Sequence, residues 1–127
     1  MISFEEAGEM LDEIADEIPE DFYRELNGGI ILLPEYKFHS AGNNLYIMGE
    51  YHNDRKGYGG LGRYIAIYYG SFINLYAHLS PEQFKEQLRA TLIHEFTHHL
   101  ESLAGDRSLE KKDAERLAKY RRRYIKS

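Results

Sequence analysis

The chain has no cysteine and no tryptophan among its 127 residues. Without cysteine it can form no disulfide bond, no zinc site built from thiolates and no cysteine nucleophile. Long apolar runs are missing too, since the longest, residues 29–33 and 65–69, are far too short to cross a bilayer. The acidic start of the chain, with Glu5, Glu6 and Glu9, is also unlike a secretory signal. We therefore expect a cytoplasmic protein that does not bind a membrane.

An excess of positive charge is also missing, because the net charge is -5. This argues against a nucleic-acid partner. Basic residues do gather near the C-terminus, where they are typical of a solvated helix end that complements the helix dipole. The length predicts one domain, residues 1–127, and leaves the oligomeric state open.

Capping residues and hydrophobic spacing predict an α+β domain. Ser3 with Glu6 forms a capping box for a first helix, and Ser80 with Gln83 opens a long helix that ends at Gly105. Short connections between the later strands favour antiparallel pairing, so we expect a small, mostly antiparallel three-stranded sheet packed on the long helix. The other expected elements are helices over residues 20–26, 71–79 and from 108 onward, strands over residues 30–33, 45–51 and 63–69, and a loop over residues 35–44.

The long helix carries the segment His94-Glu95-Phe96-Thr97-His98, which reads H-E-x-x-H. Residues four apart share one face of a helix, so His94 and His98 can offer two imidazoles to one zinc ion. Glu95 is rotated by about 100° and can reach a water bound to the metal. This arrangement predicts a zinc site with Glu95 as the general base.

A catalytic zinc commonly has three protein ligands, so a third residue is needed. Glu101 is favoured, because it follows His98 by three residues and lies close to the same helix face. Asp106 comes next, and carboxylates of the last helix stay open as alternatives: Glu110, Asp113 and Glu115.

Other side chains near the motif have predicted supporting roles. His99 points away from the metal face and is interpreted as a packing residue or one that contacts a ligand. Residues 63–69 form the strongest strand, and they could also be an edge strand that pairs with an extended peptide. An oxyanion would need a further donor, for which three tyrosines are candidates: Tyr58, Tyr64 and Tyr68.

The chain resembles the small zincin-like metallopeptidases of bacteria. The resemblance rests on EEAGEMLDEIADEIPEDF, GGIILLPE, GEYHND, GLGRYIAIYYGSF and above all TLIHEFTHHLESLAGD, which together cover most of the chain. It implies a zincin-like fold, a metal held by His94 and His98, and Glu95 as general base. Many relatives have Gly and an acidic ligand where this chain has Glu101 and Ala104, so the third ligand of the family is not carried over.

These observations predict a zinc-dependent metallopeptidase with one Zn²⁺ per chain, which hydrolyses peptide bonds through a metal-activated water. The expected substrate is a peptide or an unfolded protein segment. The alternative is a non-catalytic metal- or peptide-binding module with the same fold. A third interpretation is a structural zinc, or a polar cluster, that ties the motif helix to the last helix. Nitrogen and oxygen ligands also accept manganese, iron or cobalt.

Overall fold

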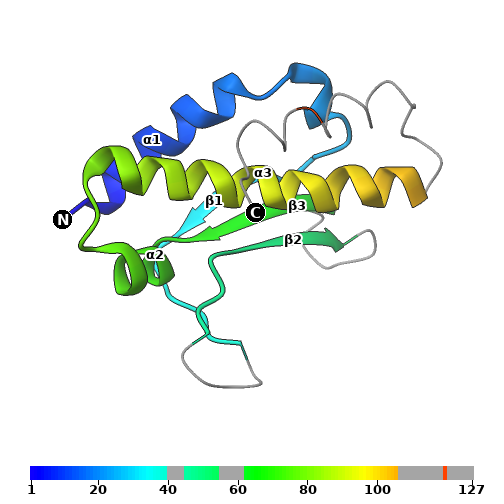
Figure 1. The fold of residues 1–127 in the computed structure, drawn as a ribbon. Coiled ribbons are helices and arrows are strands. Elements are labelled where there is room, and N and C mark those ends of the chain that lie inside the picture. The colour runs from blue at the N-terminus through cyan, green and yellow to red at the C-terminus, as the bar shows by residue number, and fades with distance from the viewer. Residues whose placement is uncertain (40–44, 55–61, 106–118, 120–127) are drawn as a thin grey trace.

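Three α-helices, a 3₁₀ helix and a three-stranded sheet make up the described part of the computed structural model, which covers residues 1–39, 45–54, 62–105 and 119. The expected α+β class is confirmed. Within these residues no helix is both long and apolar enough to cross a membrane. The helix predicted from residue 108 onward lies outside the described residues. In chain order the elements are α1 (Phe4–Glu17), η1 (Glu20–Tyr23), β1 (Gly29–Leu33), β2 (Gly49–Asp54), β3 (Gly62–Tyr68), α2 (Tyr69–Tyr76) and α3 (Pro81–Gly105) (Figure 1).

The two helix starts predicted from capping residues are confirmed. The Ser3 hydroxyl accepts a hydrogen bond from the Glu6 backbone N–H, and the Glu6 carboxylate accepts one from the Ser3 backbone N–H, both at 3.1 Å. Ser80 and Gln83 form the same reciprocal pair ahead of α3, at 3.1 and 3.2 Å. Each pair satisfies backbone donors that a helix start leaves without partners, which is why a local pattern could predict it.

The sheet differs from the expected arrangement in two ways. Its strand order is β1-β3-β2, with β2 antiparallel and β1 parallel to β3, so the sheet is mixed rather than mostly antiparallel. Residues 63–69 are not an edge strand, which was one possibility, because β3 lies in the centre. Ile65, Ala66 and Ile67 are buried on both faces of the sheet, as a central strand requires.

β2 begins at Gly49, four residues later than predicted. Residues 45–47 instead face residues 37–39, through backbone hydrogen bonds from His39 to Leu45 at 2.8 Å and from Ile47 to Lys37 at 2.7 Å, whereas the Met48 carbonyl accepts from the Tyr68 N–H of β3 at 2.9 Å. Residues 35–39 and 45–47 together form a two-stranded projection, which we call the arm. In Figure 1 the arm extends away from the side of the sheet that α1 and α3 cover.

α1 and α3 cover one side of the sheet (Figure 1). Between the helices and the sheet lies a core of fully buried side chains, among them Ile14, Phe22, Ile65, Ile67 and Phe96. This core fixes α3 across the strands.

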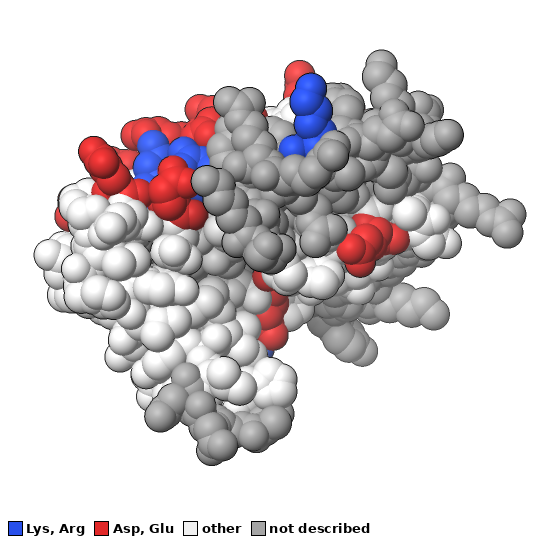
Figure 2. Space-filling model, in the orientation of Figure 1, with Lys and Arg blue, Asp and Glu red and all other residues white. Residues whose placement is uncertain are grey.

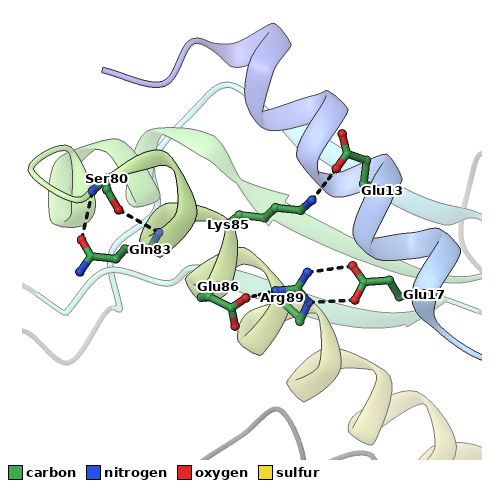
Figure 3. A network of polar contacts seen from close by, with 7 residues as sticks. All are labelled: Glu13, Glu17, Ser80, Gln83, Lys85, Glu86 and Arg89. Carbon is green, nitrogen blue, oxygen red and sulfur yellow. Dashed lines mark hydrogen bonds and ion pairs between the residues drawn. The ribbon is translucent and has the colours of Figure 1, made fainter.

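Ion pairs fasten α1 to α3 at the rim of this core (Figure 3). Arg89 of α3 donates to both carboxylate oxygens of Glu17, at 2.8 and 3.1 Å, and also contacts Glu86. Lys85, one turn earlier, pairs with Glu13. Figure 2 shows acidic side chains around a small basic group in the region of α1, which is the surface where these pairs lie.

Candidate metal and catalytic site

Two imidazoles face the same open space on α3. The Nε2 atoms of His94 and His98 lie 3.2 Å apart, and their rings are almost perpendicular, at 87°. Both side chains are exposed, because residues four apart lie one helical turn from each other on the same face. Neither residue serves the core, although the helix around them is well buried.

The two Nε2 atoms suit two ligand positions of a zinc ion. Zinc binds imidazole nitrogen at about 2.0–2.1 Å in tetrahedral geometry, which separates two ligand atoms by about 3.3 Å. The two Nε2 atoms lie within hydrogen-bonding distance of each other at 3.2 Å, and this separation is also compatible with two ligands of one zinc ion. Neutral imidazole is also the ligand type that zinc accepts most readily among the residues of this chain, which has no cysteine.

The imidazoles open into a hollow of about 690 Å³ between β2 and α3, which we call the main hollow. Sequence analysis assigned four residues to the site, and the structure brings all four to this hollow: His94, Glu95, His98 and Glu101. The other lining residues are Gly49, Glu50, Tyr51 and Ser102.

The third ligand is not apparent among the described residues. No group of three histidine or carboxylate side chains there is close enough to hold a metal ion. Glu101 is exposed and lines the main hollow without joining such a group. The alternatives Asp106, Glu110, Asp113 and Glu115 lie outside the described residues.

Glu95 sits differently from the two histidines, since only 6% of its surface is exposed. Its carboxylate accepts a hydrogen bond from the backbone N–H of Tyr51 on β2. Burial raises the pKa of Glu95 to about 7, the negative charge of Glu50 adds to the rise, and the hydrogen bond from Tyr51 opposes it. The sheet therefore holds this carboxylate at the edge of the hollow.

β2 and α3 run side by side along the main hollow. A Cβ at Gly49 would lie 3.0 Å from the Thr91 side chain, a tight contact that shows how closely the strand approaches the helix. At the other end of β2 the Asn53 amide donates to the Ser102 hydroxyl at 3.1 Å. Between these contacts Tyr51 lies beside the motif, which places the strand edge along the candidate site.

His99 supports the site from the core, in agreement with its predicted packing role. It is fully buried, and its Nε2 lies 2.8 Å from the Arg24 carbonyl and its Nδ1 2.9 Å from the Tyr51 hydroxyl. Burial lowers the pKa of His99, which favours the neutral ring. With one ring proton, Nε2–H donates to Arg24 and Nδ1 accepts from Tyr51. This bridge ties Arg24, which follows η1 directly, to α3 and β2 behind Glu95.

Glu50 also lines the main hollow and forms a cluster with Lys37 and Tyr68. Its Oε1 accepts from the Lys37 ammonium at 2.7 Å and from the Tyr68 hydroxyl at 2.6 Å. Burial pushes the pKa of Glu50 upward, but these two hydrogen bonds outweigh it and the pKa ends below its ordinary value. Burial, together with the Glu50 bond, raises the pKa of Tyr68 to about 12.

Two of the tyrosines predicted as candidate oxyanion donors make other contacts in the structure. The Tyr68 hydroxyl donates to Glu50, and the Tyr64 ring stacks on His52 at 4.7 Å between centroids. Tyr58 lies outside the described residues.

Sequence analysis gave no role to Glu50, Tyr51 or Ser102. The first two belong to GEYHND, a segment that carried part of the family resemblance, and this was the one available signal. Their place beside the motif depends on strand pairing that local patterns do not encode.

Comparison with known proteins agrees with this architecture. A solved structure of a conserved hypothetical protein from Thermus thermophilus is similar, with a TM-score of 0.71 and 34% identity, over 82% of this chain and 99% of that chain. Comparison with curated proteins finds no match. The model of the zincin-like metallopeptidase family matches residues 43–116, which is more than half of the sequence. The chain therefore belongs to the zincin-like metallopeptidase family.

Proposed function

We propose that the protein is a zinc-dependent peptidase. The observation that carries the proposal is the pair of Nε2 atoms 3.2 Å apart, exposed to an open hollow, with the buried carboxylate of Glu95 at its edge. Zinc, when bound, would polarise the carbonyl of the scissile bond and activate a water molecule. His94 and His98 would hold the ion, with Glu101 as the proposed third ligand.

Glu95 would act as the general base. Its carboxylate takes the proton from the attacking water and later gives it to the leaving amine. Two features support this role: the backbone N–H of Tyr51 orients the carboxylate, and burial keeps it from being fully solvated. A base held in one position reacts without first reorganising, which favours the proton transfer.

The outer edge of β2 would hold the substrate. β2 is the last strand in the order β1-β3-β2, and its residues Gly49 and Tyr51 line the main hollow. An edge strand offers backbone N–H and C=O groups to an extended partner, and of these groups the Tyr51 N–H already donates to Glu95. The substrate would therefore be a peptide or an unfolded protein segment that adds alongside β2.

A non-catalytic module that binds metal or peptide is the second candidate. It is favoured by the absence of a third metal-ligating group among the described residues. It predicts stoichiometric zinc, or none, without any cleavage of an unstructured polypeptide.

Replacement of Glu95 by Gln separates the two candidates. With zinc present, the wild type should cleave an unfolded protein such as casein, and Glu95→Gln should lower the rate by about 10²–10⁴-fold, because the proton acceptor is lost. Zinc content should stay unchanged. Glu82→Gln is the matched control, since Glu82 is exposed in the first turn of α3 and does not line the main hollow. Equal rates for the wild type and Glu95→Gln would disprove the general-base role, and a zinc-loaded wild type without activity would favour the binding module.

A further inference from the structure

The arm carries a cluster of aromatic and apolar side chains that are open to solvent. Tyr36, Phe38 and Leu45 are 56%, 44% and 59% exposed. The Phe38 and Tyr46 rings stack with centroids 4.5 Å apart, and Tyr36 meets both of them edge-on, at 5.4 and 6.2 Å. We call Tyr36, Phe38, Leu45 and Tyr46 the aromatic cluster. Exposed apolar side chains gathered in one place mark a surface that binds another molecule.

The arm is anchored to α2, so the aromatic cluster is held in position. The Gly70 backbone N–H donates to the Glu35 carbonyl at 3.0 Å, and the Lys37 backbone N–H donates to the buried Ser71 hydroxyl at 3.0 Å. A Cβ at Gly70 would lie only 2.6 Å from the backbone of Glu35 and Tyr36. This close backbone contact fixes the base of the arm. The rings are therefore already in place before a partner binds, and binding does not have to order them.

The aromatic cluster continues toward the candidate catalytic residues. Directly after Tyr46, residues Ile47 and Met48 line a second hollow of about 340 Å³, together with Ala90 and Thr91 of α3. This smaller hollow and the main hollow share Gly49, His94 and Glu95. From Tyr46 to Gly49 is three residues, or about 10 Å of extended chain.

We propose that the aromatic cluster binds an apolar stretch of an extended polypeptide whose chain continues through the smaller hollow to His94 and Glu95. The inference rests on the proposed function and deepens it, because it names the substrate class as unfolded segments with aromatic or aliphatic residues about three to five positions from the cleaved bond. On the side of the aromatic cluster the smaller hollow has an apolar lining, whereas the main hollow is lined by Glu50 and Glu101. This difference supports apolar substrate residues on only one side of the cleaved peptide bond.

Binding can be measured without hydrolysis, with the zinc-loaded Glu95→Gln protein and two short fluorescein-labelled peptides. One peptide contains a Phe-Leu-Phe stretch, and the other has serine at those positions. The apolar peptide should bind more tightly by about tenfold, and Phe38→Ser or Tyr36→Ser should remove this preference. Phe38→Leu should retain it, since an apolar side chain is kept at that position.

Leu75→Ser is the matched control, because Leu75 is 43% exposed on α2, outside the arm. The proposal is overturned if Leu75→Ser weakens binding as much as Phe38→Ser, or if both peptides bind equally. It is also overturned if the aromatic cluster instead mediates self-association, seen as a concentration-dependent dimer that Phe38→Ser abolishes, or binding to phosphatidylcholine vesicles. The two proposals can fail separately. If the apolar peptide is preferred in a way that depends on Phe38 but the zinc-loaded wild type cleaves no polypeptide, the binding surface is supported and only the peptidase proposal is rejected.

Discussion

Tyr51 shows how one residue links the core to the candidate catalytic carboxylate. Its backbone N–H donates to Glu95 and its hydroxyl lies 2.9 Å from the buried Nδ1 of His99. Because the two interactions use different atoms, substitution can remove the second and keep the first.

Tyr51→Phe should lower the free energy of unfolding by about 1–3 kcal/mol, because His99 would keep a buried acceptor without its donor. Urea unfolding measures this. Tyr36→Phe removes a hydroxyl from an exposed tyrosine and should change stability by less than about 0.5 kcal/mol. Similar effects of the two substitutions would show that the bridge through His99 does not stabilise the fold.

Glu50 predicts a pH dependence of stability. Despite the upward push of burial, the hydrogen bonds from Lys37 and Tyr68 leave its folded-state pKa below the ordinary value of 4.5. A carboxyl with a lowered folded-state pKa contributes stability above its unfolded-state pKa, and this contribution is lost as the pH falls through the folded-state value.

Glu50→Gln should therefore be less stable than the wild type at neutral pH, and the difference should shrink as the pH falls below about 4.5. Urea unfolding of both proteins across that range gives the comparison. A difference that stays constant with pH would show that the charge of Glu50 does not stabilise the cluster.

Among single residues, the sequence predicted those whose relative positions are determined within one helix. The four-residue spacing of His94 and His98 and the capping pairs Ser3–Glu6 and Ser80–Gln83 depend on local backbone alone. Partners from other elements, such as Tyr51 for Glu95, could not be predicted because they depend on the strand order. The roles of the site residues stay predictions.

Among the elements, the contact between β2 and α3 determines the shape of the site. Gly49 allows it, since a Cβ there would lie 3.0 Å from the Thr91 methyl group, 3.1 Å from the Ile67 side chain and 3.2 Å from the Ala66 carbonyl. A side chain at this position would require these neighbours to give by a few tenths of an ångström.

Gly49→Ala should destabilise the protein by about 1–3 kcal/mol through overpacking. Gly8→Ala is the opposite case. Gly8 lies inside α1, and a Cβ there would make an ordinary 3.9 Å contact with the Leu32 side chain of β1. There alanine should add about 0.5–1 kcal/mol through its better helix propensity. Urea unfolding of the two variants tests the pair, and a neutral Gly49→Ala would mean that β2 does not pack closely on α3.

The elements were predicted less well where pairing is nonlocal. Residues 45–51 have strand-like composition, but the first three pair within the arm and the strand begins at Gly49. The parallel pairing of β1 with β3 was missed because the 28 residues between them, 34–61, include β2 and make the crossover. One signal was available for β3, since apolar residues at consecutive positions 65–67 indicate burial on both faces and therefore a central strand.

At the scale of the whole molecule, α1, the sheet and η1 hold α3 in place from three directions. Ion pairs from Glu13 and Glu17 hold its first half, and the Arg24 carbonyl accepts from His99 in its second half. The motif faces the remaining side, where the two hollows lie. Family membership followed from the motif and its flanking segments, whereas the path of a substrate across the molecule depends on the arm, where sequence analysis expected a loop and the start of a strand.

Zinc content tests the central claim most directly. Elemental mass spectrometry of the purified wild type should find about one zinc per chain, and His94→Ala should lose most of it, since one imidazole cannot hold the ion alone. His78→Ala, which replaces an exposed histidine that lines neither hollow, should keep the wild-type content. A wild type that binds no zinc after the metal is added back, or a His94→Ala variant that retains it, would contradict a metal site at His94 and His98.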